Sequence, residues 1–110
     1  MSPNSFLGEF EQMVLLAVLQ RGDGAFALDV RREIERSADR SVSRGAFYTT
    51  LERLERKGFV RWSEDEPADG RRGALRRYEV TPAGLGALRE SRRALDALSR
   101  GLGGLLGETP

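Results

Sequence analysis

The sequence predicts a mainly α-helical domain with one small β-hairpin, followed by a further C-terminal helix. Two observations lead to this prediction. Three short segments with apolar residues at helical spacing come first, and two segments (FVRWSE and LRRYEV) then alternate apolar and charged residues. With 110 residues, 39% of them hydrophobic and 32% charged, the chain is long enough for one modest core. We therefore expect one compact unit, made of a first domain over residues 1–81 and a C-terminal helix over residues 82–110.

The first helix is expected from Gly8 to Arg21, after a loose N-terminal arm, and it is apolar around nearly its whole circumference. A helix of this kind must be covered on all sides. Two interpretations stay open: the helix is the centre of the core of one protomer, or one of its sides meets a second subunit. A turn at residues 22–24 leads to a second expected helix from about Ala27 to Ser37, with Leu28 and Ile34 among its apolar residues.

The third helix is predicted between Val42 and Gly58 and has one apolar and one polar face. Ser43 can cap its first turn, and Gly58 can end it. Its apolar face is a stripe at i, i+4 and i+7, formed by Phe47, Leu51 and Leu54. The other face carries groups that bond phosphates and base edges: Arg44, Gly45, Tyr48, Thr49, Glu52, Arg53 and Arg56. Two short helices joined by a brief turn, the second with a polar outward face, form a helix-turn-helix.

The two strand-like segments predict an antiparallel hairpin in a definite register. If the numbers of paired residues sum to 140, the hairpin contains one aliphatic pair, one aromatic pair and two pairs of opposite charge. The pairs are then Val60 with Val80, Arg61 with Glu79, Trp62 with Tyr78, and Glu64 with Arg76. A shift by one residue would mismatch the two faces. The connection from Asp65 to Ala74 is too long for a tight turn, and we expect it to be a mobile wing tip.

The last helix is expected to begin with Thr81 as N-cap and Pro82 in the first turn. Leucines at 88, 95, 98, 102 and 105 follow a seven-residue repeat, while glycines should fray or bend the helix after Arg100. A core helix would explain the leucines, but the three helices and the hairpin already fill the core. The leucine seam therefore predicts a homodimer. The residues expected at the dimer contact are Phe10, Leu15, Leu88, Leu95, Leu98 and Leu102.

The composition argues against an enzyme. The chain has no histidine and no cysteine, which removes the usual general base, the thiol nucleophile and the common zinc ligands. We expect no catalytic residue, no metal site and no cofactor. Met13 to Leu19 is an apolar run far shorter than the ~20 residues of a membrane span, and no signal peptide is visible, so a cytoplasmic protein without a membrane partner is expected.

Positive charge is concentrated in the middle of the chain. The net charge is only +1, but residues 36–77 hold eleven Arg or Lys against seven Asp or Glu, a local charge of +4. The two flanking segments sum to −3 and to zero. Because the excess coincides with the third helix and the hairpin, this region is the candidate nucleic-acid interface.

The stretches RGAFYTTLERLERKGFVRW and GRRGALRRYEVTPAGLGALRE together resemble the PadR family of bacterial transcription regulators. The resemblance covers Gly8 to about Arg93, and its most specific parts are GAFY in the third helix, RY in the hairpin and TPxG at the last helix. It implies a winged-helix domain with a dimerising C-terminal helix, usually acting as a repressor. Many members have proline where this chain has Thr49, a departure that concerns base preference rather than fold.

Some family members also bind small aromatic compounds at the dimer interface, through aromatic residues. In this chain the hairpin pairing already accounts for Trp62. Phe6 and Phe10 could line such a pocket, although packing in the core or in the dimer is the favoured role. The identity of any small-molecule effector stays open.

The expected mode of DNA binding assigns different roles to different side chains. The N-terminal half of the third helix should enter the major groove, with Arg44 reading guanine and Tyr48 bonding a phosphate. Arg71 and Arg72, at the wing tip, should reach phosphates or a minor groove. The full set of expected DNA-binding residues is Ser43, Arg44, Tyr48, Thr49, Arg71, Arg72, Arg76 and Arg77.

The sequence thus predicts a sequence-specific regulator of transcription, a repressor that binds a two-fold operator in double-stranded DNA as a dimer. The alternative is a winged helix used as a protein-protein interaction module without DNA binding, since fold does not fix function. A wing that docks on protein would be apolar. The four arginines on and beside this wing favour DNA.

Overall fold

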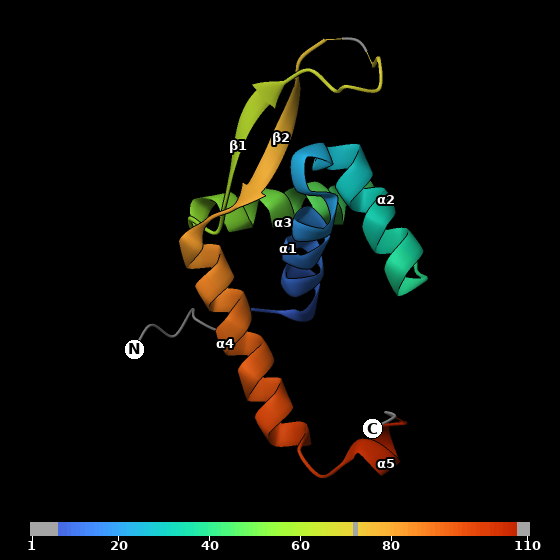
Figure 1. Cartoon of the computed structure of the whole chain (residues 1–110), viewed down its shortest axis with the longest axis vertical. Helices are drawn as coiled ribbons and strands as arrows, with labels where there is room; N and C mark the ends of the chain where they lie inside the picture. Colours follow the sequence, from blue (N-terminus) through green and yellow to red (C-terminus); the bar gives the residue numbers. More distant parts are fainter. Residues whose placement is uncertain (1–6, 72, 108–110) are drawn as a thin grey trace.

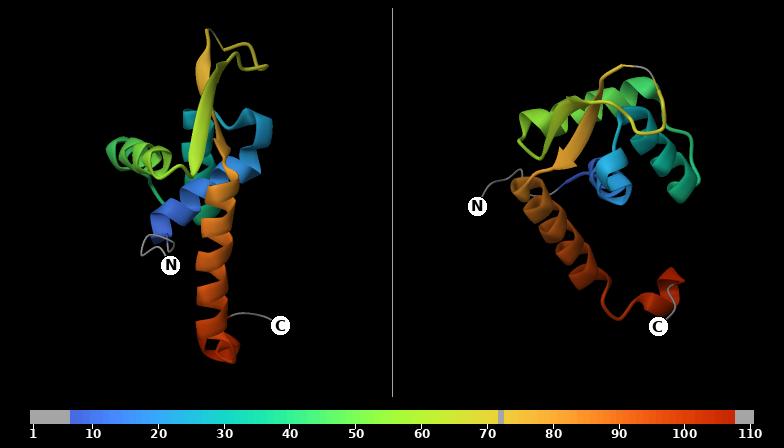
Figure 2. Two further views of the ribbon diagram at one scale, coloured as in Figure 1. Left: turned by 90° about the vertical axis from the view of Figure 1, so that its left-hand side faces the viewer. Right: turned by 45° about the horizontal axis from the view of Figure 1, so that its top comes forward.

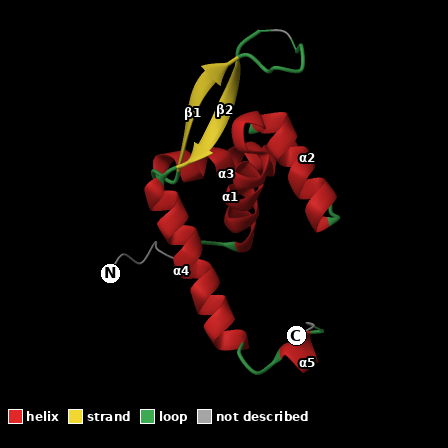
Figure 3. Cartoon of the chain, viewed as in Figure 1, coloured by secondary structure: helices red, strands yellow, loops and turns green. Residues whose placement is uncertain are grey.

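The computed structural model describes residues 7–71 and 73–107, and over these it is mainly helical with one two-stranded antiparallel sheet (Figures 1 and 3). The elements in order are α1 (Glu9–Arg21), the 3-10 turn η1 (Gly22–Gly24), α2 (Ala27–Ala38), α3 (Arg44–Arg56), β1 (Val60–Asp65), β2 (Leu75–Val80), α4 (Pro82–Ser99) and α5 (Gly103–Leu106). The expected N-terminal arm, apart from Leu7, lies outside the described residues, as do Phe6, Arg72 and residues 108–110.

Both predicted helix caps are confirmed. The hydroxyl of Ser43 accepts a hydrogen bond from the amide of Ala46 at 3.0 Å, and the hydroxyl of Thr81 accepts one from the amide of Gly84 at 3.0 Å. The Thr81 hydroxyl also donates to the carbonyl oxygen of Gly58 at 2.6 Å. The start of α4 is thereby fixed to the turn that ends α3.

The core is built around α1, which contacts α2, α3, α4 and β2. Val14 and Leu15 of α1 are fully buried, and Phe47 and Leu54 of α3 pack in the same cluster. The apolar circumference of α1 is therefore covered largely by elements of its own chain. Leu28, expected on the apolar side of α2, is 36% exposed, because it lines a surface groove with Phe26 and Ala27 instead of packing in the core.

The hairpin has the predicted register. Val60 pairs with Val80, Trp62 with Tyr78, Arg61 with Glu79 and Glu64 with Arg76. A short segment after η1 adds to the edge of β2, where Phe26 forms a bridge with Arg77 and the amide of Tyr78 donates to the carbonyl oxygen of Ala25 at 2.9 Å. The hairpin is therefore attached to the start of α2 as well as to the end of α3. Helix-turn-helix plus attached hairpin is the winged-helix arrangement predicted from the sequence.

Helix α4 leads away from the winged helix, and its C-terminal half extends beyond α1, α2 and α3 (Figures 1 and 2). The helix ends at Ser99, close to the predicted limit, and Gly101 follows with φ of 81°, a left-handed conformation that glycine adopts without strain. The predicted repeat therefore stops early: Leu102 and Leu105 do not continue the seam of α4, because the chain turns at Gly101 before α5 begins.

Candidate nucleic-acid interface

The N-terminal ends of α2 and α3 and one face of the hairpin meet around a shared groove. Its lining comes from Phe26, Ala27, Leu28, Arg44, Tyr48, Arg71, Leu75, Arg76 and Tyr78. Three of these nine side chains are arginines, and none is acidic. The cationic groove thus lies between the wing and α3, the helix predicted to enter the major groove as a recognition helix.

The polar face of α3 is accessible at its N-terminal end, because Phe47, Leu51 and Leu54 turn the opposite face into the core. Arg44 and Thr49 are exposed, and Tyr48 is 38% exposed. The guanidinium carbon of Arg44 lies 5.8 Å from the centroid of the Tyr48 ring.

The ring of Tyr48 also packs edge-on against Phe47, with ring centroids 5.4 Å apart. Because Phe47 is fully buried, this contact fixes the plane of the tyrosine against the core. Tyr48 in turn supports the guanidinium of Arg44. Arg44 and Tyr48 are therefore placed together, at the end of α3 where a recognition helix reads DNA.

The wing contributes Arg76 to the groove. Its guanidinium carbon lies 3.9 Å from the centroid of the Trp62 ring, so the cation stacks on the indole. The register sets Glu64 opposite Arg76 as predicted, but the guanidinium is placed against the ring rather than in an ion pair. Tyr78, opposite Trp62, is 4% exposed, and burial raises the pKa of its phenol. Its hydroxyl therefore stays protonated at neutral pH and adds no negative charge to the groove.

Arg77 lies on the other face of β2 from Arg76. Its Nε lies 3.1 Å from an oxygen of Asp65, and its side chain is 24% exposed. The charge of Arg77 is thus partly balanced within the hairpin. Among the described arginines expected to bind DNA, Arg44 and Arg76 have no carboxylate partner within ion-pair distance.

Arg71 is not directed outward from the wing, which was its expected position. Its guanidinium pairs with Asp29 at the start of α2, with Nη2 to Oδ2 at 2.7 Å, and with Asp69, with Nε to Oδ2 at 3.0 Å. The side chain turns toward the start of α2 because Asp29 and the ring of Phe26 lie on that side. Sequence reasoning missed Asp29 and Phe26 as its partners. Arg72, the other wing-tip residue of the prediction, lies outside the described residues.

The expected dimer residues divide into buried and exposed ones. Leu15 and Leu88 are 0% and 3% exposed, since both pack in the core of the protomer, and they offer no surface to a partner. Phe10 is half-buried against that core. On α4, Leu95 is 57% and Leu98 79% exposed, and Leu102 beyond its end is 41% exposed.

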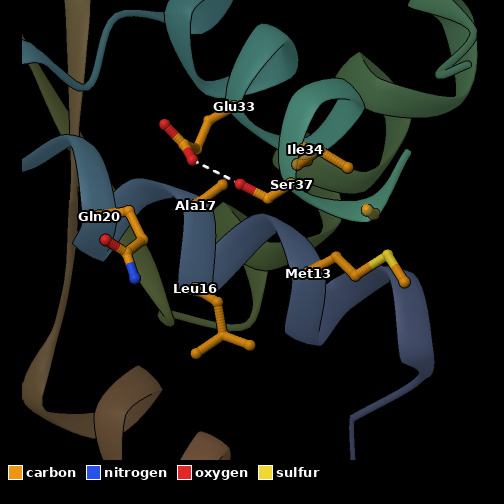
Figure 4. Close-up of a pocket in the computed structure, with 8 residues that line it drawn as sticks. Met13, Leu16, Ala17, Gln20, Glu33, Ile34 and Ser37 are labelled. Carbon is orange, nitrogen blue, oxygen red and sulfur yellow. Dashed lines mark hydrogen bonds between the residues drawn. The ribbon is translucent and has the colours of Figure 1, made fainter. Parts of the chain in front are cut away.

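A second hollow lies between α1 and α2, and it is mostly apolar (Figure 4). Its lining is Met13, Leu16, Ala17, Gln20, Glu33, Ile34, Ser37 and Ala38. The carboxylate of Glu33 accepts hydrogen bonds from Ser37 at 2.6 Å and from Arg36, and these bonds lower its pKa. The hollow therefore presents packing surface and one carboxylate that is already hydrogen-bonded, not a reactive group.

The part of the chain that the structure describes has neither a metal-binding group of side chains nor a membrane-spanning helix. Residues 7–71 and 73–107 contain no group of three or more Asp, Glu, His or Cys side chains able to hold a metal ion. Within the same ranges, no helix combines the length and the apolar character needed to cross a bilayer.

The pattern of one family, described as the transcriptional regulator PadR-like family, matches residues 15–90. The chain belongs to this PadR-like family. Its members are transcriptional regulators and not enzymes, so the PadR resemblance seen in the sequence and the non-enzymatic assignment are both confirmed. The match runs from the middle of α1 through most of α4, so it includes the whole groove.

The chain is also similar to individual proteins. The chain is 52% identical over 59 residues to the transcriptional regulator Rv3488 of Mycobacterium tuberculosis, a match over 54% of this chain and about half (52%) of that relative. The fold is similar to a PadR-like transcription factor from Bacteroides fragilis, with a TM-score of 0.68, 22% identity and coverage of 87% of this chain and 88% of the other. It is also similar to a transcriptional regulator from Clostridium thermocellum, with a TM-score of 0.67, 16% identity and coverage of 82% and 85%.

Proposed function

We propose that this PadR-like regulator binds double-stranded DNA sequence-specifically, as a homodimer on a two-fold operator, and represses transcription. The observation that carries the proposal is that Arg44 on α3 and Arg76 on β2 line the same groove. Each guanidinium is supported by an aromatic ring, Tyr48 or Trp62, and among the described residues neither has a carboxylate within ion-pair distance. Binding to DNA would place the protein in the cytoplasm, the compartment predicted from the sequence.

The two arginines are proposed to act differently. Arg44 lies in the first turn of α3, where a side chain meets base edges, and a bidentate contact with guanine is worth about 1–3 kcal/mol of discrimination. One turn further on, Tyr48 is proposed to bond a DNA phosphate, and Thr49 to contact the major groove of the DNA. Ser43 holds the helix end through its cap, and its exposed position lets it face a phosphate. Arg76 lies on the wing and is proposed to bond a phosphate, which positions the protein without reading sequence.

A homodimer is proposed because two exposed leucines on α4, Leu95 and Leu98, have no cover in the described part of the protomer. Two copies of α3 related by a two-fold axis would read a two-fold operator. The proposed contact retains Phe10, Leu95, Leu98 and Leu102 and omits the buried Leu15 and Leu88.

The proposal is tested by a salt series on operator and on random DNA, after selection of bound fragments from genomic DNA with the purified protein. Arg76→Ala should weaken binding to both DNAs and reduce the log–log salt slope by about 0.9 for each phosphate that the variant no longer binds. Arg44→Ala should mainly remove the advantage of the operator over random DNA.

Matched controls remove the same charge at other places. Arg61→Ala removes an arginine from the opposite face of the hairpin, where Arg61 pairs with Glu79 at 3.3 Å, and Arg56→Ala removes one from the far end of α3. Both should leave the ratio of operator affinity to random-DNA affinity unchanged. If the wild-type protein selects no fragment, and its binding to random DNA is as weak at low salt as at high salt, the interaction-module alternative replaces this proposal.

A further inference from the structure

Arg71 is held by more partners than any other described arginine of the wing. Its Nη2 donates to Asp29 at 2.7 Å, and its Nε and its backbone amide donate to Asp69 at 3.1 and 3.2 Å. Its guanidinium carbon also lies 5.3 Å from the centroid of the Phe26 ring. The side chain is 31% exposed, and that of Asp29 only 15%.

These contacts span two parts of the fold that are distant in sequence. Asp29 is in the first turn of α2, and Arg71 is 42 residues later in the connection between β1 and β2. Among the described residues of this connection, 66–71 and 73–74, Pro67 is buried and the others except Arg71 are exposed. A charged hydrogen bond to a partly buried carboxylate adds a restraint near its middle. The wing is thereby fixed to the element that precedes the recognition helix.

Arg71 is also poorly suited to bind a phosphate while it is held in this way. Two carboxylates already use its Nε donor and one Nη2 donor, so a phosphate could bond only the remaining N–H groups of a guanidinium whose charge is already balanced. Conversely, Asp29 without Arg71 would be a bare carboxylate beside the groove proposed to receive DNA, where it would repel phosphates. The ion pair therefore has two effects: it restrains the wing, and it neutralises the charge of Asp29 at the edge of the groove.

We propose that Asp29 and Arg71 form a latch that positions the wing for DNA, and that Arg71 is a positioning residue rather than a phosphate contact. Its role in DNA binding rests on the function proposed above. The latch itself is a property of the free protein, so the two claims can fail separately. This role replaces the phosphate contact that the sequence analysis assigned to Arg71.

The decisive measurement is the sign of the effect of Asp29→Asn, which removes one negative charge next to DNA. A carboxylate with no structural role would repel the phosphates, so its removal would strengthen binding. The latch predicts the opposite, a two- to fivefold weaker binding to both operator and random DNA, about the effect expected for a partly exposed ion pair. Asp39→Asn, at the other end of α2, makes the same charge change outside the latch and should not weaken binding.

Coupling between the two residues gives a second test. Arg71→Ala should weaken binding more than Asp29→Asn, because it opens the same ion pair and also leaves the Asp29 carboxylate bare beside the groove. The double variant lacks that carboxylate, so it should bind no worse than Arg71→Ala alone. The exchange of charges, Asp29→Arg with Arg71→Asp, should recover part of the affinity at unchanged net charge. Additive effects and no recovery would show that Arg71 binds phosphate directly.

A measurement without DNA separates the latch from the proposed function. Limited trypsin digestion cuts after arginines of the connection between β1 and β2, and Asp29→Asn should speed this cleavage several-fold while circular dichroism shows an unchanged fold. Faster cleavage in a protein that binds no DNA would support the latch and refute the function. Unchanged cleavage together with stronger DNA binding by Asp29→Asn would overturn the latch and leave the function standing.

Discussion

The carboxylate of Glu11 lies 2.8 Å from the ammonium group of Lys57, so that the first turn of α1 is ion-paired with the residue that ends α3. Glu11 also accepts a hydrogen bond from the amide of Gly8 at 2.9 Å, and its side chain is 9% exposed. Next to it, the amide of Leu7 donates to the buried hydroxyl of Ser91 at 2.9 Å. The start of α1 is therefore joined to the end of α3 on one side and to α4 on the other.

This ion pair predicts an acid-sensitive contribution to stability. Burial by itself would raise the pKa of Glu11, but the hydrogen bonds from Lys57 and Gly8 and the charge of Lys57 outweigh it, and the pKa is lowered. Because the folded-state pKa lies below the unfolded value near 4.5, the contribution is present above pH 4.5 and is lost as the pH falls through the folded-state pKa. Glu11→Gln should lower the free energy of unfolding by about 1–3 kcal/mol at pH 7.

Urea denaturation of both proteins at pH 7 and at pH 3 checks this prediction: the difference between wild type and Glu11→Gln should shrink at pH 3. The matched control is Glu9→Gln, because Glu9 is on the same turn and pairs with Arg40 at 3.3 Å, but its side chain is 77% exposed. Its effect should stay below about 0.5 kcal/mol. An equal effect of the two substitutions at both pH values would contradict the role of the Glu11–Lys57 pair.

A glycine at the start of α4 allows a close backbone contact. A Cβ atom on Gly84 would lie 2.2 Å from the carbonyl oxygen of Phe59 and 2.9 Å from its carbonyl carbon. Neither atom can move freely, because the same oxygen accepts a hydrogen bond from the amide of Thr81 at 3.0 Å. Gly84→Ala should therefore destabilise the protein by more than about 2 kcal/mol.

The control for this substitution is two residues away on the same helix. A Cβ atom on Gly86 would have no neighbour within 4 Å, so Gly86→Ala should stabilise the protein by up to about 1 kcal/mol through helix propensity alone. Thermal unfolding of the two variants gives the answer in one experiment. Opposite signs are expected. A stabilised Gly84→Ala protein would mean that α4 does not approach the end of α3 in this way.

Elements governed by local chemistry could be predicted closely from the sequence. Ser43 and Thr81 cap their helices because a hydroxyl before a helical segment satisfies a free amide nearby in sequence. The hairpin register follows from matching faces, since one slipped residue would put Trp62 opposite a charged residue. The family membership rests on the same segments.

Contacts between distant residues could not be predicted in this way. The wing carries several acidic groups close to Arg71, and no spacing rule selects Asp29, which lies on another helix. Likewise, an apolar circumference cannot tell which side of α1 its own chain covers, so Leu15 appeared equally suited to a core and to a dimer. These choices depend on how complete elements pack, which periodicity does not specify.

The stack of Arg76 on Trp62 can be observed directly, because Trp62 is the single tryptophan of the chain. Arg76→Ala should expose one face of the indole to water and shift the fluorescence emission to the red. Arg61→Ala, on the opposite face of the hairpin, removes the same charge and should leave the emission unchanged. A red shift in both variants would show that it comes from general loosening of the hairpin and not from removal of the stacked cation.

The exposed leucines of α4 lead to a prediction about assembly. Leu95 and Leu98 are three residues apart, so they lie on one side of the helix, and both are more than half exposed. Since they contribute little to the protomer core, Leu95→Arg with Leu98→Arg should leave the helix content unchanged while it turns a dimer into a monomer at micromolar concentration.

Sedimentation velocity and circular dichroism on the same samples measure assembly and folding together. Ala97→Arg places a cation on α4 outside the leucine pair, at an exposed position, and should preserve the dimer. Leu88→Arg should instead unfold the protein, because Leu88 is 3% exposed and an uncompensated charge cannot be buried there at low cost. A wild-type chain that sediments as a monomer would refute the proposed dimer, and with it the reading of a two-fold operator by two linked copies of α3.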